Sequence, residues 1–204
     1  FVDLVINRIF SKINKGIYID LGCNHPIKFN NTYLLYKKGW TGINIDSDEK
    51  SIKEFNKFRN KDTNINAIVS SKNKSIKYYY YHDRSALNTV DKFLVRTRKK
   101  KPKKVLIKKT TTLNQIIQNS PYKNKKINFL SVDIENHEYE ALKKFKFHKY
   151  KIDIIVIEIL NIKTKRLETQ NQNLKNIIKS KIYKLLIKNN YKLINWINSD
   201  FVFV

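Results

Sequence analysis

The sequence IYIDLGCNHPIKFNNTYLLYKKGWTGINID, residues 17–46, carries the clearest structural signal in the chain. It contains two short apolar runs, Ile17–Leu21 and Thr41–Asp46, and each run closes on or beside an acid. Such runs are typical of buried strands, and residues 32–38 between them read as a short helix that stops at Gly39. A strand, a helical crossover and a second strand predict a parallel pair in an α/β sheet.

The same alternation continues along the chain. Apolar periodicity predicts helices over residues 1–14, 48–59, 112–119, 136–145 and 167–189. Further strands are predicted over residues 66–70, 75–81, 105–109, 127–133 and 152–159, with a terminal hairpin formed by 191–197 and 201–204. We therefore expect one domain over residues 1–204, with a three-layer α/β fold and a mostly parallel sheet.

The composition limits the classes of protein to which the chain can belong. Of its 204 residues, 41% are hydrophobic, which is enough for the core of one ordinary domain. The single cysteine, Cys23, excludes an internal disulfide framework and a cysteine-rich zinc site. No stretch approaches the roughly 20 apolar residues that span a bilayer, and the charged N-terminus is not a signal peptide. These features predict a cytoplasmic protein, and the missing initiator methionine predicts that it is excised from a longer chain.

The net charge of +25 would by itself suggest a nucleic-acid partner or an anionic surface. However, the chain contains 36 Lys, 25 Asn and 29 Ile, residues with A/T-rich codons, but only six Arg. Nucleic-acid binders rely on Arg for bidentate contacts, so we attribute most of the charge to a nucleotide bias. The exception runs from Arg96 to Lys109, with nine basic residues in fourteen. This basic segment is either a solvated loop or a site for a polyanionic substrate or surface.

Acidic residues mark the predicted strand ends. Ligands bind beyond the carboxyl ends of parallel strands, so acids at these ends predict a site there. A carboxylate after the second strand can accept both hydrogen bonds of a ribose diol, whereas helix capping is the structural alternative. Two of these acids, Asp20 and Asp46, are separated by one strand-helix-strand unit. Together they favour a nucleoside-containing cofactor. The four acids are Asp20, Asp46, Asp133 and Glu158.

The stretch FLSVDIENHEYEAL, residues 129–142, crowds titratable side chains into one strand end and the turn that follows. Neighbouring carboxylates repel, so one of Asp133, Glu135 and Glu138 can hold a raised pKa and act as a base. His137 can take the same role near neutral pH. A solvated helix N-terminus, where the helix dipole favours acids, is the alternative. A zinc helix of the H-E-x-x-H kind is absent, because the second histidine is missing.

Six motifs in order, YIDLGCNHP, NNTYLLYKKGWTGINIDSD, AIVSS, SALNT, TTLNQII and FLSVDIENHEYEAL, resemble the FkbM family of S-adenosylmethionine-dependent methyltransferases. The resemblance covers roughly residues 16–158. Two positions depart from the family pattern. Asn136 replaces the usual Gly, and Asn is the next most tolerant residue at positive φ, so the turn can survive. Cys23 stands where Ala is usual, which is a small change.

The resemblance implies a seven-stranded, Rossmann-like methyltransferase sheet that includes the antiparallel C-terminal hairpin. It also implies methyl transfer to a hydroxyl, often on sugars or other secondary metabolites, with Asp133 and Glu135 facing the reacting centre. The cofactor residues that it implies are Asp20, Gly22 and Asn24 at the methionine end, Asp46 at the ribose, Ser47 beside the adenosine, Ser70 near the adenine, and Asn31 and Thr32 closing the pocket.

A hydroxyl acceptor must lose its proton, so the mechanism needs a base. We expect Glu135 or His137 in this role and Asp133 as the residue that orients the cofactor or acceptor, with Glu158 as a second-rank candidate. Asp133, Glu135 and Glu158 could instead gather a divalent metal, although we expect none to be needed. The basic insertion, residues 82–109, would lie over the strand ends near the acceptor.

Three functions follow from these features. The first is an O-methyltransferase that acts on a glycan, a sugar precursor or a related small molecule. The second is a methyltransferase of RNA, such as a cap ribose, supported by the basic segment and the tyrosines of residues 78–81, which could stack on bases. Consecutive residues of a strand alternate faces, so at most two of these tyrosines share a surface. The third is a non-catalytic domain that keeps only the fold, which the retained acids disfavour.

Overall fold

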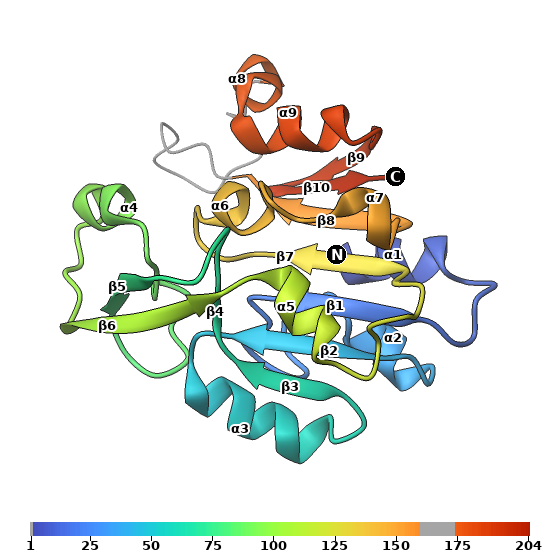
Figure 1. The fold of residues 1–204 in the computed structure, drawn as a ribbon, viewed down its shortest axis with the longest axis horizontal. Helices are drawn as coiled ribbons and strands as arrows, with labels where there is room; N and C mark the ends of the chain where they lie inside the picture. Colours follow the sequence, from blue (N-terminus) through green and yellow to red (C-terminus); the bar gives the residue numbers. More distant parts are fainter. Residues whose placement is uncertain (1, 160–173) are drawn as a thin grey trace.

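The computed structural model describes residues 2–159 and 174–204. Within these residues, a seven-stranded sheet has the spatial order β3-β2-β1-β7-β8-β10-β9 (Figure 1). Neighbouring strands from β3 to β8 are parallel, and β10 is antiparallel to both β8 and β9. The predicted α/β fold with its C-terminal antiparallel hairpin is therefore confirmed. The strands are β1 (Ile17–Leu21), β2 (Thr41–Asp46), β3 (Thr63–Asn66), β7 (Phe129–Val132), β8 (Ile154–Glu158), β9 (Leu193–Ile197) and β10 (Asp200–Phe203).

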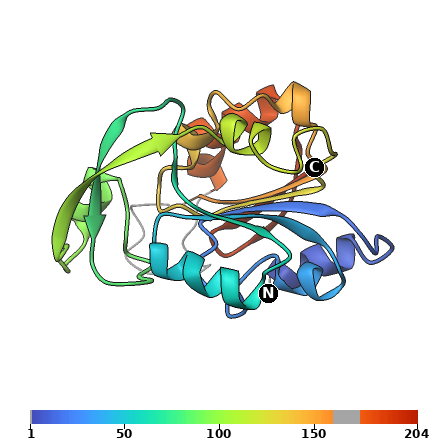
Figure 2. The same ribbon diagram turned by 60° about the horizontal axis from the view of Figure 1, so that its bottom comes forward.

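Helices cover both faces of the main sheet, as Figure 2 shows. One face carries α1 (Val2–Ile9), α2 (Tyr33–Lys37) and α3 (Glu49–Phe58). Alternate strand residues serve the two faces: Tyr18 packs into the core beside α1 and α2, whereas Ile19 packs into the larger core on the other face. That other face carries α5 (Leu113–Gln118), α6 (Glu138–Leu142), α7 (Phe147–Tyr150), α8 (Leu174–Lys179) and α9 (Lys181–Lys188).

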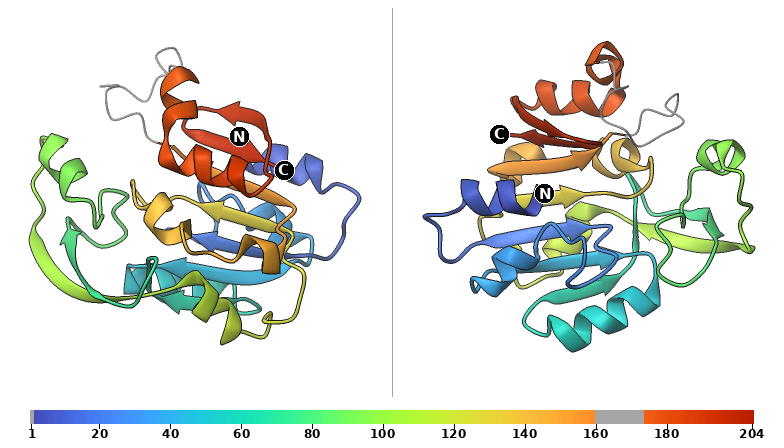
Figure 3. Two further views of the ribbon diagram at one scale, coloured as in Figure 1. Left: turned by 45° about the horizontal axis from the view of Figure 1, so that its top comes forward. Right: turned by 180° about the vertical axis from the view of Figure 1, so that it is seen from behind.

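A smaller three-stranded sheet has the order β4-β6-β5 and combines β4 (Ile68–Val69), β5 (Ser75–Tyr80) and β6 (Lys104–Thr111). The chain between β5 and β6 contains α4 (Lys92–Thr97). We call residues 75–111 the arm. It projects beyond the C-terminal ends of the parallel strands, on the left of Figure 1 and in both views of Figure 3. The arm contains the predicted basic insertion and therefore stands at the edge where a ligand site is expected.

Three predicted elements differ from the structure. The strand expected over residues 66–70 is divided: Thr63–Asn66 pairs with β2, and Ile68–Val69 pairs with β6. The sequence did not predict β3 because this edge strand, with the sequence TNIN, is mostly polar, whereas Ile68 and Val69 are apolar and buried. The long helix expected over residues 167–189 is interrupted at Ser180, whose hydroxyl caps α9 by accepting from the amide of Tyr183. Its first part, 167–173, lies outside the described residues.

The basic insertion, residues 82–109, contains the helix α4, which the sequence did not predict. Asp91 begins this helix by accepting a hydrogen bond from the amide of Leu94, and Leu94 and Val95 are buried. None of the helices that the structure describes is both long and apolar enough to cross a membrane.

Candidate active site

A cavity of about 100 Å³ lies at the C-terminal ends of the strands, between the main sheet and the arm. Its lining includes Gly22, directly after β1, where φ is +87°. A Cβ atom at this position would lie 1.7 Å from the carbonyl oxygen of Asp133, so only glycine lets the ends of β1 and β7 meet. Glycine is therefore required here to bring two motifs of the sequence together.

The turn after β2 forms one wall of the cavity. Asp46 Oδ2 accepts a hydrogen bond from the amide of Asn24 at 2.9 Å, and its Oδ1 accepts from the amide of Asp48 at 2.8 Å. Burial raises the pKa of Asp46 to about 6, although these two amides favour the ionised form. Ser47 lies beside it, and its hydroxyl donates to the hydroxyl of Tyr78 at 3.1 Å. Asn24, Asp46, Ser47 and Tyr78 all line the cavity.

Three carboxyl groups gather at the ends of β7 and β8. One oxygen each from Asp133, Glu135 and Glu158 lies within 4.8 Å of the others. Asp133 and Glu135 line the cavity, whereas Glu158 does not. Glu158 Oε1 accepts from the hydroxyl of Ser199 at 3.2 Å, and its buried Oε2 has no hydrogen-bond partner among the described residues. We call these three residues the carboxylate cluster.

The carboxylate cluster holds its protons more tightly than separate carboxyl groups would. Burial, followed by the negative charge of Glu135, raises the pKa of Asp133. Burial, followed by the charge of Asp133, raises the pKa of Glu158 still further. Glu158 is therefore the member that stays protonated at neutral pH, and Asp133 ionises before it. Oxygen atoms at this separation could also hold a divalent cation.

The turn that presents Glu135 has an uncommon backbone conformation. Glu135 has φ of 56° and Asn136 has φ of 70°, so two successive residues adopt the left-handed conformation. The sequence predicted positive φ at Asn136, and this is confirmed, but it did not predict it at Glu135. Left-handed non-glycine residues cost about 1 kcal/mol or more each and tend to occur where function requires them.

Glu135 also forms an ion pair with the arm. Arg98, directly after α4, donates from Nη2 to Glu135 Oε2 at 2.5 Å and from Nη1 to the carbonyl of Leu87 at 2.6 Å. The hydroxyl of Thr89 donates to the carbonyl of Glu135 at 3.0 Å. Burial raises the pKa of Glu135, and the guanidinium of Arg98 opposes that shift. The arm thus covers the cavity and contacts the predicted base directly.

On the opposite wall, the arm is attached to the start of α3. Asp48 Oδ1 caps the helix by accepting from the amide of Lys50 at 2.9 Å. Its Oδ2 accepts from the amide of Arg84 at 2.7 Å. The sequence predicted only that a helix begins at residue 48, and it placed Arg98 in the basic segment without a role of its own. Both residues hold residues 84–98 across the cavity.

His137 and Glu138 are buried at the start of α6, and His137 lines the cavity whereas Glu138 does not. Burial lowers the pKa of His137 to about 4, so its imidazole is neutral at pH 7 and is a weak base. Its Nε2 lies 3.3 Å from the hydroxyl of Ser70, which does not itself line the cavity. Burial raises the pKa of Glu138 to about 8, and its Oε1 accepts from the amides of Ile134 and Asn136.

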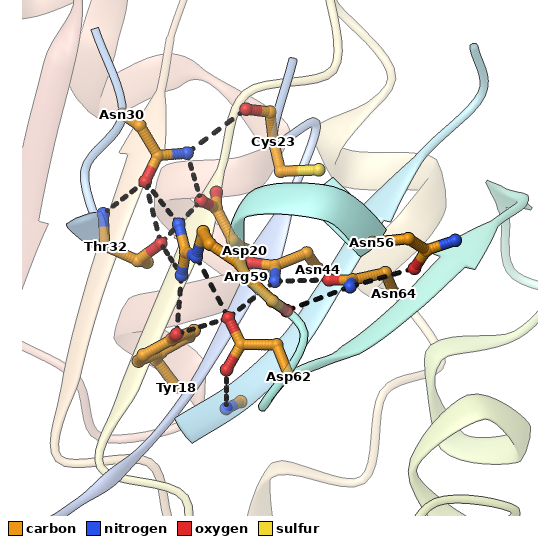
Figure 4. Close-up of polar contacts among 11 residues, drawn as sticks. Tyr18, Asp20, Cys23, Asn30, Thr32, Asn44, Asn56, Arg59, Asp62 and Asn64 are labelled. Atoms are coloured by element: carbon orange, nitrogen blue, oxygen red, sulfur yellow. Dashed lines mark hydrogen bonds and ion pairs between the residues drawn. The ribbon is translucent and has the colours of Figure 1, made fainter. Parts of the chain in front are cut away.

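Asp20 lies outside the cavity lining, in a buried polar network drawn in Figure 4. Its Oδ2 accepts from Asn30 Nδ2 at 2.8 Å and from the hydroxyl of Thr32 at 2.9 Å. Thr32 also accepts from Arg59 Nη2 at 2.9 Å. The structure therefore places Asp20 and Thr32 in a buried polar network outside the cavity lining. Asn31, another predicted pocket residue, likewise does not line the cavity, and its amide donates to the hydroxyl of Ser131 at 3.1 Å.

A model of the FkbM methyltransferase domain matches residues 20–185, which is well over half of the chain. The chain belongs to the FkbM methyltransferase family. Membership supports a methyltransferase activity, and proteins of this family generally use S-adenosylmethionine. A search of curated proteins gives no match to the chain. The match begins at Asp20 and includes both the Asp46 turn and the carboxylate cluster.

The residues of the cavity fit the chemistry of S-adenosylmethionine. A carboxylate can accept about four hydrogen bonds. Asp46 accepts two from backbone amides, so it can still accept hydrogen bonds from ribose hydroxyls. Ser51, which also lines the cavity, has a buried hydroxyl oxygen without a hydrogen-bond partner in the described parts of the chain. Negative carboxyl groups at Asp133 and Glu135 suit a sulfonium cation. The cavity therefore offers hydrogen-bond acceptors for the ribose hydroxyls and negative charge for the sulfonium, which are the features that such a ligand requires.

Proposed function

We propose that the chain is an S-adenosylmethionine-dependent O-methyltransferase acting on a hydroxyl of a glycan, a sugar precursor or a related small molecule. The supporting observation is that one cavity is lined both by the Asp46 turn, which suits a ribose, and by Asp133 and Glu135, which suit proton transfer. Parallel α/β sheets bind their ligands at this edge, which agrees with that assignment.

S-adenosylmethionine, when bound, supplies a methyl group activated by a sulfonium. In this proposal Asp46 accepts hydrogen bonds from the ribose hydroxyls, and Asn24 and Ser47 border the same ligand. Asp133 contributes negative charge near the cationic centre, while protonated Glu158 keeps the cluster from accumulating more charge. The arm excludes water from the cavity through the contacts of Arg98 and Thr89.

We assign the base to Glu135 rather than to His137. Arg98 engages Oε2 of Glu135, which leaves Oε1 to receive the proton of the acceptor hydroxyl. Its pKa is raised by burial, which makes the carboxylate a better base than a solvated glutamate. His137 has a pKa lowered to about 4 and is therefore the weaker proton acceptor.

The cofactor assignment is tested with Asp46→Asn. Asn cannot accept on both side-chain atoms, so we expect calorimetric affinity for S-adenosylhomocysteine to fall at least about tenfold, as for a hydrogen bond to a charged group. Asp153→Asn is the matched control, because Asp153 pairs with Lys126 at the other end of the sheet. Equal affinity in both variants would exclude Asp46 as the ribose ligand.

The base is tested with Glu135→Gln. This change keeps the shape and removes the proton acceptor, so turnover should fall about 10²–10⁴-fold. Affinity for S-adenosylhomocysteine should stay within about twofold. The assay follows transfer of a labelled methyl group to a panel of sugars and sugar nucleotides. Full turnover in the variant would exclude Glu135 as the base.

The metal alternative has its own test. If the carboxylate cluster holds a divalent cation, EDTA should abolish turnover and Mg²⁺ or Mn²⁺ should restore it. If the carboxylates act directly, turnover should be insensitive to EDTA.

RNA stays the second candidate acceptor, because most basic side chains of the basic segment are exposed on the arm beside the cavity. Binding of an oligoribonucleotide would weaken steeply with salt, since several phosphates would release counterions. Weak binding that does not depend on salt would favour the glycan acceptor.

A further inference from the structure

Two basic side chains of the basic segment are less exposed to solvent than the others. Seven of its nine basic residues are exposed, whereas Arg98 and Lys108 are only partly exposed. Arg98 reaches Glu135, as described above. Lys108 reaches the opposite wall of the cavity, and no part of the proposed mechanism yet uses it.

The position of Lys108 follows from strand alternation. In the antiparallel pair of β5 and β6, Tyr78 lies opposite Leu106, so Tyr78, Leu106 and Lys108 share one face. That face is the cavity side, because Tyr78 lines the cavity. Lys109 belongs to the other face and is exposed. Two adjacent lysines in a basic run therefore have different surroundings.

The side chain of Lys108 forms a hydrogen bond with the main chain of the turn after β2. Its Nζ donates to the carbonyl oxygen of Ser47 at 2.7 Å and lies 4.3 Å from the ring centroid of Tyr78. Tyr78 in turn accepts from the hydroxyl of Ser47 at 3.1 Å. The arm thus forms hydrogen bonds with both the backbone and the side chain of Ser47, which lies between Asp46 and Asp48.

The electrostatics of this contact favour a specific role. Burial lowers the pKa of Lys108, and the carboxylates of Asp48 and Asp46 oppose that shift. The ammonium is therefore coupled to the same carboxylate that would bind the ribose. An ammonium above a tyrosine ring is further stabilised by cation–π attraction.

We propose that Lys108 is a positioning residue that fixes the turn of residues 46–48 and thereby strengthens the recognition of ribose hydroxyls by Asp46. The inference rests on the proposed cofactor. It predicts that a residue of the arm, far from β2 in the sequence, controls cofactor affinity.

The first measurement is calorimetric binding of S-adenosylhomocysteine to the wild type, Lys108→Met, Lys108→Arg and Lys109→Met. Met keeps the length of the side chain but cannot donate, so we expect about tenfold weaker binding, as for loss of a charge-assisted hydrogen bond. Arg keeps the cation and its donors and should restore most of the affinity. Lys109→Met should match the wild type. Equal affinities for Lys108→Met and Lys109→Met would overturn the proposal.

The second measurement asks whether the loss is specific to the ribose. The same titrations use the 2′-deoxy analogue of S-adenosylhomocysteine. In the wild type, loss of this hydroxyl should weaken binding about tenfold, and in Lys108→Met the penalty should shrink to about twofold, because the two changes act on one interaction. An undiminished penalty would show that Lys108 does not position Asp46 and would overturn the proposal.

A third readout separates the failure of this inference from the failure of the proposed function. Hydrogen exchange of the amides of residues 47–50, measured without ligand, should be faster in Lys108→Met than in the wild type or Lys109→Met. If exchange rises but the wild type does not bind S-adenosylhomocysteine, the positioning of the turn stands and the cofactor assignment fails. If exchange is unchanged, the positioning role fails whatever the chain binds.

Discussion

The buried network around Arg59 and the carboxylate cluster beside the cavity are both built from charged residues at or near strand ends, but they differ in how fully their charges are paired. Arg59 is 0% exposed and donates to Asp62, Asn30, Tyr18 and Thr32 (Figure 4). Its guanidinium also lies about 5 Å from the ring centroids of Tyr18, Tyr36 and Phe55.

The carboxylate of Asp62, like the guanidinium of Arg59, has hydrogen-bond partners for both of its terminal atoms. Its two oxygens accept from the amide of Gly42 at 2.9 Å, from Asn44 Nδ2 at 2.8 Å and from the hydroxyl of Tyr18 at 2.6 Å. A buried ion pair is tolerated only when its remaining hydrogen-bonding capacity is met in this way. The network joins β1, β2 and the end of α3, and none of its members lines the cavity.

The carboxylate cluster has the opposite character. It brings three carboxyl groups together with one guanidinium, that of Arg98, and leaves Glu158 Oε2 without a hydrogen-bond partner in the described chain. Folding alone does not require this arrangement, since apolar residues at these positions would avoid the repulsion. The contrast suggests that full pairing marks a structural role and that incomplete pairing marks the site of chemistry.

The largest effect should follow from breaking the paired network. Arg59→Met leaves the carboxylates of Asp62 and Asp20 buried without their cation, so the free energy of unfolding should fall by about 3–5 kcal/mol. Urea denaturation monitored by circular dichroism measures the change. Arg96→Met, at an exposed position on α4, is the control and should change stability by less than about 0.5 kcal/mol. Equal stabilities of the two variants would remove the structural role of the network.

A second effect concerns pH and Glu138, which contacts the turn beneath the carboxylate cluster. Its pKa is raised to about 8 by burial, so the folded protein keeps a proton that the unfolded chain releases above about pH 4.5. Folding therefore takes up a proton in this window, and stability should decrease as the pH rises from about 5 to 8. One such group contributes a slope of up to about 1.4 kcal/mol per pH unit.

Glu138→Gln is permanently neutral and should flatten this slope, while its carbonyl oxygen can still accept from the amides of Ile134 and Asn136. Urea denaturation of both proteins at several values between pH 5 and 8 gives the comparison. Glu140→Gln is the control, because Glu140 is partly exposed and its pKa is lowered by Lys143. Parallel slopes for the wild type and Glu138→Gln would contradict the prediction.

The comparison also shows what could be predicted from the sequence. Four acids at strand ends were predicted to mark the site; Asp46 and Asp133 line the cavity, whereas Glu158 does not. Asp20 does not, because it lies within β1, one residue before the end of the strand. Side chains alternate along a strand, so Asp20 shares the face of Tyr18 and joins the Arg59 network. A single position separates these two outcomes, and apolar patterns do not fix strand ends to one residue.

A stronger signal was present in the scarcity of arginine. In a chain with 36 Lys and six Arg, a codon bias that favours Lys leaves arginine where its geometry is needed. Within the described residues, Arg59, Arg84 and Arg98 form ion pairs with Asp62, Glu54 and Glu135. The pairing partners themselves could not be predicted, because each pair except that of Arg59 joins segments far apart in the chain.

The smallest effect on stability should come from the carboxylate cluster itself. Glu158 is protonated at neutral pH because burial and the charge of Asp133 raise its pKa, so Gln at this position preserves the charge state. Glu158→Gln should change the free energy of unfolding by less than about 1 kcal/mol, well below the change for Arg59→Met. The same substitution removes an acidic proton from the carboxylate cluster, so methyl transfer should slow more than stability falls. If Glu158→Gln instead destabilised the fold as strongly as Arg59→Met, incomplete pairing would not distinguish a reactive site from a structural one, and the carboxylate cluster would have to be regarded as part of the scaffold.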